Sequence, residues 1–240
     1  EFRRVLFRSM RSVLGRKPIG TIAYMGGIMA VPEEFAWSWG QMLAYNAEMW
    51  LADKPTAFIH YARARASDHA PARNQLASSM LGDWLIQFDC DHTFDCDIAH
   101  RLVRLADEAG VDVVSAMYQF KHEPHSPVAF HYDERGSRPI ASWSQNAKLI
   151  EIGATGGGCL FVRRSVFDRI AAECPDQPFT RFVGWSEDHS FFRRCHELGI
   201  KTYLAPQLHC NHLIVRPVTL EDYQVEHRQT EQSHLVGGFA

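Results

Sequence analysis

The chain has 240 residues, 46% hydrophobic and 22% charged, a composition that is ordinary for one sizeable globular domain. Its 25 basic and 28 acidic side chains give a formal net charge of −3, which argues against binding a nucleic-acid polymer through a broad basic surface. The sequence has no apolar run near the ~18 residues that a membrane span needs.

The N-terminal segment EFRRVLFRSM carries charge but no extended apolar core, so it does not resemble a secretory signal. Glu1-Phe2 is what a common restriction site encodes, and Met10 is a plausible native start. We therefore expect residues 1–9 to be a non-native leader, residues 10–218 to form a single domain, and residues 219–240 to be a polar C-terminal tail.

The chain contains six cysteines and no C-x-x-C pair. Several lie inside apolar runs, which is typical of reduced thiols in a protein core. We therefore expect free thiols and a reducing, cytoplasmic location. A zinc site is the alternative, but the spacings of its candidate ligands match no standard zinc module. Those candidates are Cys195, His196, Cys210 and His212.

The first part of the chain alternates between strand and helix patterns. Short apolar, β-rich runs predict strands at 20–25, 56–61 and 84–89. Helical spacing of apolar residues predicts helices at 33–50 and within 67–80. The run WLIQFD at 84–89 is almost unbroken, as in a central strand covered on both faces.

The next segments begin with a helix at 96–109 that ends at Gly110, followed by a strand at 111–118. The stretch 119–147 is rich in loop residues, with VAFHY and AKLIEI as candidate sheet segments in and just after it. The chain then returns to regular structure with a predicted strand, CLFVRR, at 159–164.

The last elements are a helix in SVFDRIAAEC, a helix within 185–199 closed by Gly199, and a strand at 201–206. Strands that alternate with helices predict an α/β fold, in which helices cover both faces of a mostly parallel sheet. Ligands of such sheets bind beyond the carboxyl ends of the strands.

Asp89 and Asp91 follow the buried strand at such an end. On an extended stretch, side chains at i and i+2 point the same way, so both carboxylates can converge on one ion. Mg²⁺ and Mn²⁺ prefer such oxygen ligands and share their shell with substrate phosphates. The alternative is that Asp91 or Asp95 caps the helix that begins near Asp97; because Asp95 suffices as the cap, we favour a metal site.

Glu187 and Asp188 follow Ser186 at a predicted helix start, where carboxylates also complement the helix dipole. They gain interest because transfer to a hydroxyl needs a carboxylate base. His212 follows the last strand, with His209 as a close competitor.

Two further motifs concern an anionic ligand. The run Gly156-Gly157-Gly158 lets backbone N–H groups approach a sugar or phosphate, unless it is a plain turn. Arg73-Asn74 places a guanidinium where it could hold a diphosphate, unless it lies on a solvated helix face.

The order of these motifs resembles the GT-A-fold glycosyltransferases, most closely the family 2-like group with a D-x-D and an E-D motif. The quoted stretches are ARN, DWLIQFDCDHTF, GATGGGCLFVRRSVFDRI, WSEDHSFF and HCNH, and the resemblance covers about residues 20–213. It implies a single-domain, Rossmann-like α/β/α sandwich. It also implies a hexosyltransferase-like enzyme that uses Mn²⁺ or Mg²⁺ and a nucleotide-diphosphate sugar donor.

The resemblance implies a role for each matching residue. Asp89 and Asp91 would be the D-x-D pair that reaches the ribose and the metal, and His212 would complete the metal shell. Asp188 would be the base, and Glu187 would bind or orient the acceptor. The remaining matches concern the donor. Arg73 and Asn74 would lie on the nucleotide side, and Gly157 and Gly158 under the donor sugar.

The sequence also departs from the family pattern. It has no Q-x-x-R-W stretch, the mark of processive synthases, so we expect a single addition to a saccharide, lipid-linked or protein acceptor. With one carboxylate base and a displacement from the opposite face, the anomeric configuration would invert. The usual opening after the first strand is replaced by AYMGGIMAVPEEF. Two other functions stay open: a metal-dependent nucleotidyltransferase or phosphohydrolase, and a catalytically silent module that binds nucleotide sugars.

Overall fold

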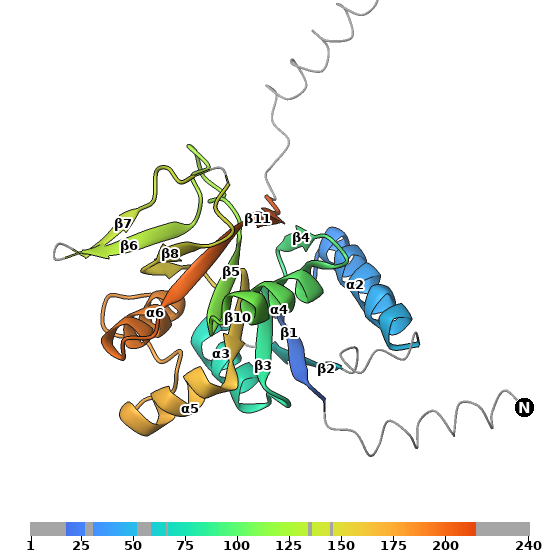
Figure 1. Cartoon of the computed structure of the whole chain (residues 1–240), viewed down its shortest axis with the longest axis horizontal. Helices are drawn as coiled ribbons and strands as arrows, with labels where there is room; N and C mark the ends of the chain where they lie inside the picture. Colours follow the sequence, from blue (N-terminus) through green and yellow to red (C-terminus); the bar gives the residue numbers. More distant parts are fainter. Residues whose placement is uncertain are drawn as a thin grey trace, which may run out of the picture.

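The computed structural model describes residues 18–26, 31–51, 59–65, 67–133, 136–144 and 146–214. The expected leader at 1–9 and the tail from 219 lie outside these ranges. The described part forms a large central sheet with helices on both faces and a small three-stranded sheet beside it (Figure 1). In chain order the elements are β1 (Gly20–Gly26), α2 (Glu33–Leu51), β2 (Ile59–Arg65), α3 (His69–Ser78), β3 (Trp84–Asp89), β4 (His92–Phe94), α4 (Ile98–Ala109), β5 (Val113–Met117), β6 (Ala129–Asp133), β7 (Gly136–Pro139), β8 (Ile150–Ile152), β9 (Ala154–Thr155), β10 (Cys159–Arg163), α5 (Arg164–Glu173), α6 (Glu187–Glu197) and β11 (Thr202–His212).

The predicted order of helices and strands is confirmed, and the differences are local. β3 occupies the predicted residues 84–89. The strand predicted at 56–61 is instead described from Ile59 to Arg65. The last strand continues past the predicted 206 as far as His212, because it leaves β5 after an irregularity and pairs with β4.

The start of α4 differs from the expected cap. The N-cap position is Asp97, and no side chain caps the helix there. Asp95 contributes only its backbone carbonyl, which accepts from the N–H of Ile98, while its carboxylate lies 3.6 Å from Arg101. The cap predicted for Asp95 is therefore wrong. The predicted end is confirmed, since Gly110 adopts the left-handed conformation, φ 64°, that closes a helix.

The central sheet has the strand order β2-β1-β3-β10-β5-β11-β4, and β8 also pairs with β11. Among its six central strands only β10 runs against the others, since β10 is antiparallel to both neighbours while the remaining pairs are parallel. The chain leaves β5 at its carboxyl end, forms β6 to β9, and returns at that same edge. β10 therefore has to run back.

Alternating side chains divide the core between the two faces of the sheet. On β10, Cys159 and Phe161 join the cluster that contains α2 and α4, whereas Leu160 and Val162 join the cluster that contains α3, α5 and α6. Figure 1 shows α2 on one side of the sheet and α5 and α6 on the other. The expected three-layer architecture is thus confirmed.

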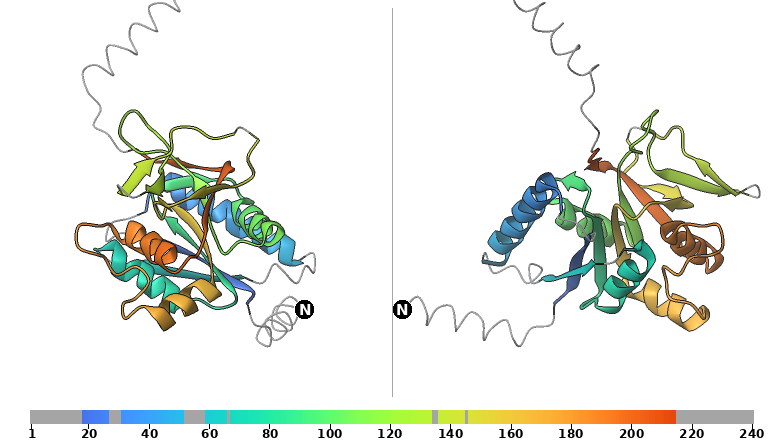
Figure 2. Two further views of the ribbon diagram at one scale, coloured as in Figure 1. Left: turned by 60° about the vertical axis from the view of Figure 1, so that its left-hand side comes forward. Right: turned by 180° about the vertical axis from the view of Figure 1, so that it is seen from behind.

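The small sheet, β7-β6-β9, packs on the central sheet through an apolar cluster that joins Ala129 of β6 to Met117 of β5 and Leu204 of β11. It lies at the end of the molecule where β11 finishes, as both views of Figure 2 show. All six cysteines are free thiols, as predicted. None of the described helices combines the length and apolar character that crossing a bilayer requires.

The packing of β10 yields a stability prediction. Leu160 is 0% exposed, whereas Leu81 is 47% exposed. Leu160→Ala should lower the free energy of unfolding by about 2–5 kcal/mol, because it leaves a cavity in the core. The same change at Leu81 should stay within about 0.5 kcal/mol of wild type. Urea unfolding of both variants tests this, and equal midpoints would contradict the described packing.

Candidate active site

The two aspartates that follow β3 have different partners. β3 ends at Asp89, and Cys90 and Asp91 form a turn into β4, so the extended chain required for parallel side chains does not continue. Asp89 contacts Arg73, with Nη2 at 2.8 and 3.1 Å from its two carboxylate oxygens. Asp91 contacts His92, Lys121 and His212 instead. The expectation that both carboxylates converge on one point is therefore wrong.

A cluster of potential metal ligands forms around Asp91. Asp91, His92 and His212 each offer one ligand atom, and these atoms lie within 4.8 Å of one another. His92 Nδ1 is 2.9 Å from Asp91 Oδ1, and His212 Nε2 is 3.4 Å from Asp91 Oδ2. The sequence-based expectation that Asp91 and His212 lie together is confirmed. His92 joins them, and Asp89 does not belong to this cluster.

Strand pairing explains why the histidines meet. β11 crosses to β4 at its end, and His212 and His92 are direct antiparallel partners there. Their rings stack with centroids 4.2 Å apart and an interplanar angle of 17°. His212 Nδ1 lies 2.9 Å from the carbonyl of Gln119, which leaves Nε2 on the side of Asp91.

The charges around the cluster favour the protonation states that bind a cation. Burial raises the pKa of Asp91, but hydrogen bonds from His92 and Lys121 outweigh it, so the pKa lies well below its usual range. Burial and the adjacent His92 ring lower the pKa of His212 despite the contact with Gln119. A carboxylate and a neutral imidazole are the ligating forms of these side chains.

The donor set fits a divalent ion. Such an ion holds nitrogen and oxygen ligands at about 2.0–2.2 Å, so opposite ligand atoms lie up to about 4.4 Å apart, close to the spread of this cluster. Imidazole nitrogen suits borderline ions, whereas Mg²⁺ prefers an all-oxygen shell. One carboxylate with two imidazoles is a mixed oxygen and nitrogen donor set, which a divalent transition-metal ion accepts more readily than Mg²⁺ does.

Arg73 joins three parts of the fold next to this cluster. The side chain is 1% exposed, so the alternative of a solvated helix face is wrong. Nε donates to Glu187 at 3.2 Å, Nη1 to the carbonyl of Gly157 at 3.2 Å, and Nη2 to Asp89. Burial alone would lower its pKa, but the carboxylates of Asp89 and Glu187 raise it above the usual value. The guanidinium is a permanent buried cation.

Glu187 faces cations of the protein. It is 4% exposed and lies 3.2 Å from Arg73, 3.5 Å from His69 and 3.5 Å from Arg181. Burial raises the pKa of Glu187, but His69 and Arg73 outweigh it and lower the pKa to about 2. The same contact raises the pKa of His69. The role predicted for Glu187 toward the acceptor stays a prediction.

The three consecutive glycines are sites of close approach. A Cβ at Gly156 would lie 2.1 Å from the Tyr118 hydroxyl, one at Gly157 would lie 2.2 Å from Arg73 Cζ, and one at Gly158 would lie 2.7 Å from His92 Nε2. Real Cβ atoms do not approach so closely, so each position needs a glycine for space. This run is not a plain flexible turn, because the backbone packs on protein side chains.

Asp188 is the second residue of α6 and lies on the other side of Gly156. Its Oδ1 accepts from the hydroxyl of Ser186 and, at 2.8 Å, from the N–H of His189. Its Oδ2 is 3.2 Å from the Cβ position of Gly156, next to the Tyr118 hydroxyl. Among the described residues Oδ2 accepts no hydrogen bond. Asp188 thus lies where a carboxylate complements the helix dipole, as the alternative explanation requires. Its Oδ2 is nevertheless available to accept a proton.

Tyr118 connects Asp188 with the histidines. Its ring contacts His92 and His212 edge-on, with centroids 4.7 and 5.6 Å away. Its hydroxyl oxygen accepts from the N–H of Gly158 at 3.3 Å. Burial, followed by the charges of Asp89 and Asp188, raises its pKa well above the usual value, so the phenol stays neutral.

The remaining predicted residues have structural partners. The amide oxygen of Asn74 accepts from the N–H of Phe179 at 2.9 Å. His209 is exposed on β11 and is not part of the ligand cluster. Cys195 and Cys210 belong to core clusters on opposite faces of the sheet, so the zinc alternative is wrong.

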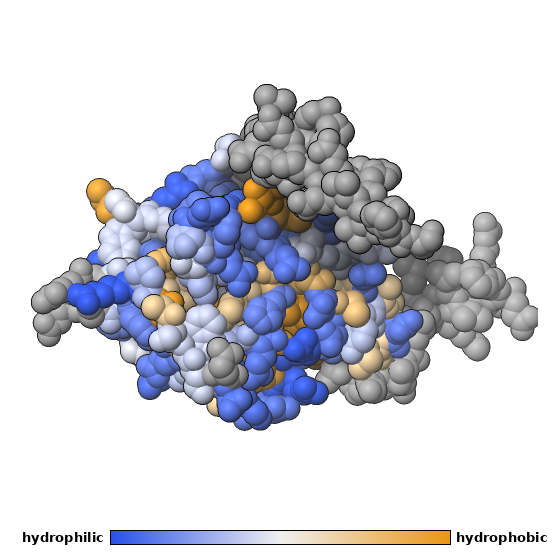
Figure 3. Space-filling view, turned by 90° about the horizontal axis from the view of Figure 1, so that it is seen from above, coloured by the Kyte–Doolittle hydropathy of each residue, from blue (hydrophilic) through white to orange (hydrophobic). Residues whose placement is uncertain are grey.

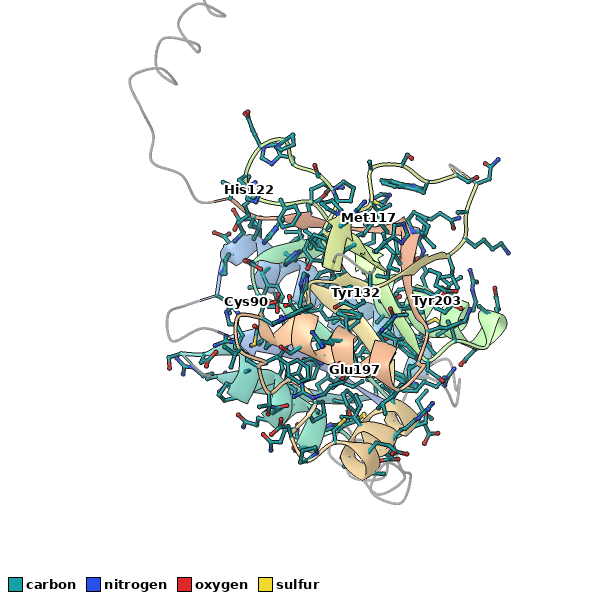
Figure 4. The ribbon with its side chains drawn as sticks, turned by 90° about the vertical axis from the view of Figure 1, so that its left-hand side faces the viewer. Cys90, Met117, His122, Tyr132, Glu197 and Tyr203 are labelled. Atoms are coloured by element: carbon teal, nitrogen blue, oxygen red, sulfur yellow. The ribbon has the colours of Figure 1, made fainter. Side chains whose placement is uncertain are left out.

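Three residues of the site were not predicted: His92, Tyr118 and Lys121. Sequence signals existed for two of them, since His92 follows Asp91 directly and Tyr118 follows the end of a predicted strand. Figure 4 labels Cys90 and His122, the neighbours of Asp91 and Lys121, and both lie on the same side of the ribbon. Lys121 gave no signal in the sequence because it lies in a loop.

The site lies at the carboxyl edge of the parallel strands. The view from above in Figure 3 shows the described surface at this end as hydrophilic, interrupted by hydrophobic patches. A cavity of about 710 Å³ lies at the opposite edge, where Ile19, Ile59, Trp84 and Arg163 contribute to its lining, and it includes none of the predicted site residues.

Solved structures share this fold. A197 from STIV is 19% identical, with a TM-score of 0.54, and the alignment covers 81% of this chain and 86% of that chain. GalNAc-T7, solved with UDP, GalNAc and Mn²⁺, is 11% identical, with a TM-score of 0.55; 88% of this chain aligns with 48% of that chain. The present chain thus spans about half the length of that neighbour. No curated protein matches the sequence.

The family described as "Glycosyl transferase family 2" matches residues 46–171. This stretch is 126 of the 240 residues, more than half of the chain, and contains Arg73, Asp89, Asp91 and the glycine run. The chain therefore belongs to glycosyl transferase family 2 and is a glycosyltransferase with the GT-A fold.

Proposed function

We propose that this glycosyltransferase depends on a divalent ion, with Mn²⁺ favoured. It would transfer one sugar from a nucleotide-diphosphate donor to an acceptor hydroxyl, with inversion at the anomeric carbon. The observation that carries the proposal is the cluster of Asp91, His92 and His212, with ligand atoms within 4.8 Å, at the edge where Asp188 also lies. Such a pairing of a cation site with a carboxylate base suits the chemistry of sugar transfer.

The divalent ion, when bound, would supply positive charge to the leaving diphosphate. Asp91, His92 and His212 would hold it, and Asp188 would take the proton of the acceptor hydroxyl through Oδ2. The acceptor oxygen then bonds to the anomeric carbon from the side opposite the breaking bond to the diphosphate. Proximity of the two reactants at one sheet edge contributes much of the acceleration.

We assign Arg73 a positioning role. Its guanidinium already binds Asp89, Glu187 and the carbonyl of Gly157, so it fixes the end of β3, the start of α6 and the glycine run in one arrangement. Asp89 retains 22% exposure of its side chain, which leaves it able to contact the ribose of the donor. The roles of Asn74, Gly157 and Gly158 on the donor side are proposals of the same kind.

The acceptor would approach where the small sheet meets the start of α6. Phe130 and Tyr132 of β6 lie against the start of α6, with the Phe130 ring 4.9 Å from His189 and the Tyr132 hydroxyl donating to the His189 carbonyl at 3.3 Å. Loops carried on a rigid sheet are the variable, selective parts of enzymes. A saccharide, a lipid-linked acceptor or a protein acceptor would be distinguished there.

The cation site predicts a specific loss of metal binding. His212→Ala should weaken Mn²⁺ binding roughly tenfold or more, because even second-shell changes cost about 10–100-fold. His209→Ala is the matched control, since His209 is an exposed histidine of the same strand, and should bind like wild type. Titration of Mn²⁺, with and without UDP or GDP, measures both. Equal affinities for the two variants would contradict the assigned site.

The proposed base predicts a loss of transfer without loss of binding. Asp188→Asn keeps the shape but removes the proton acceptor, so transfer should fall by about 10²–10⁴-fold while nucleotide affinity persists. Asp97→Asn, at the start of α4, controls for effects at a helix terminus. If Asp188 only complements the dipole, its variant will lose about 0.3–1 kcal/mol of stability and stay active. Single-turnover transfer rates decide between these outcomes.

The buried ion pair of Glu187 predicts a pH dependence of stability. Because its folded-state pKa is depressed, to about 2 from 4.5, its contribution is complete above pH 4.5 and is lost as the pH falls toward 2. The shift corresponds to about 3 kcal/mol. The Glu187→Gln variant should therefore have a lower free energy of unfolding than wild type at pH 7. Between pH 4.5 and 2, its free energy of unfolding should change less with pH than that of wild type.

The matched control for this ion pair is Glu197→Gln on the same helix, where the carboxylate is 51% exposed. Denaturant unfolding at several pH values compares the three proteins. A Glu187→Gln profile parallel to that of wild type would show that the pair contributes nothing.

A further inference from the structure

The candidate cation site already contains a cation of the protein. Lys121 Nζ donates to Asp91 Oδ2 at 2.6 Å, and the same oxygen lies 3.4 Å from His212 Nε2. The ammonium therefore takes up the carboxylate oxygen that faces His212, on the side where a shared ion would have to bind. His92 occupies the other oxygen, Oδ1, at 2.9 Å.

The loop that carries Lys121 is held in place at its base. The N–H of Phe120 donates to the carbonyl of Ser126 at 2.9 Å, and Gln119 pairs with Pro127 across the loop. His212 Nδ1 contacts the carbonyl of Gln119 at 2.9 Å. The histidine of the cluster thus fixes the stem of the loop two residues before Lys121.

The side chain, unlike the base of the loop, is partly exposed to solvent. Lys121 is 44% exposed, so its ammonium reaches Asp91 from the solvent side on a flexible four-carbon stem. A divalent ion bound to Asp91 Oδ2 would repel the ammonium at such a short distance. A displaced ammonium loses its ion pair with Asp91. An anionic ligand bound to the divalent ion would be the nearest group with which it could form a new one.

We propose that Lys121 is a tethered cation that competes with the divalent ion for Asp91 and passes to the diphosphate of the donor when the ion binds. This inference rests on the proposed metal centre. It makes binding of the ion and the nucleotide interdependent: the ion alone has to displace Lys121 without compensation, whereas the ion and the diphosphate together give the ammonium a new partner. Ion and nucleotide should consequently bind cooperatively.

The test measures Mn²⁺ affinity without activity. Lys121→Met removes the competing charge and should bind Mn²⁺ alone about two- to fivefold more tightly than wild type, the range expected from losing an exposed ion pair. Its gain in Mn²⁺ affinity on adding UDP or GDP should be smaller than the wild-type gain. Lys201→Met is the matched control, since Lys201 is also exposed and also pairs with a carboxylate, Glu151, at 2.8 Å.

The outcomes separate this inference from the metal centre itself. The proposal is supported if Lys121→Met, but not Lys201→Met, binds Mn²⁺ more tightly than wild type and gains less Mn²⁺ affinity from the nucleotide. It is also supported if Lys121→Met binds Mn²⁺ measurably where wild type binds too weakly to measure. Unchanged or weaker Mn²⁺ affinity, an unchanged nucleotide effect, or an equal change in Lys201→Met overturns it and leaves the metal centre standing. If neither wild type nor Lys121→Met binds Mn²⁺ with or without nucleotide, both proposals fail.

Discussion

The site depends on one buried cation, the guanidinium of Arg73. It is enclosed by the carboxylates of Asp89 and Glu187 and by the carbonyl of Gly157. These three acceptors come from β3, from α6 and from the turn before β10, so a single side chain sets the mutual positions of three elements. Taking a charge out of water is costly unless its partners are well placed. The buried guanidinium therefore favours the one arrangement of β3, α6 and the glycine run in which all three acceptors reach it. Gly157 follows from it, because a Cβ at this position would lie 2.2 Å from Arg73 Cζ.

A second constraint is the pairing of β4 with β11. It places His92 opposite His212 and brings both to Asp91 in the turn before β4. The chemistry of the site therefore has two supports: an ion pair that aligns β3 with α6, and a short antiparallel ladder that aligns the histidines. Tyr118 packs between them, with its ring on the histidines and its hydroxyl beside Gly156. Both supports act at the same edge of the sheet.

Patterns within single segments predicted most of the fold. The almost unbroken apolar run at 84–89 predicted a central strand, and β3 is buried along nearly its whole length. Gly110 predicted the end of α4, and it adopts the left-handed conformation that glycine reaches most easily. The site was only partly predictable. That Asp91 and His212 meet followed from family resemblance, but the part played by His92 depends on strand register between distant segments. The surroundings of Arg73 also could not be read locally, since its partners lie 16, 84 and 114 residues away.

The reversed direction of β10 has a consequence for how such an enzyme can diversify. β5 and β10 are paired neighbours, so the chain between them leaves and re-enters the sheet within about 4.8 Å, one strand spacing. The ends of this excursion stay joined whatever its length, and lengthening a loop whose ends are already fixed adds little entropic cost. Insertions can thus be accommodated at points of the excursion away from Gln119, Lys121 and Tyr132, which contact His212, Asp91 and the start of α6. The excursion can therefore vary in length while its contacts with the candidate site keep that edge of the sheet in place.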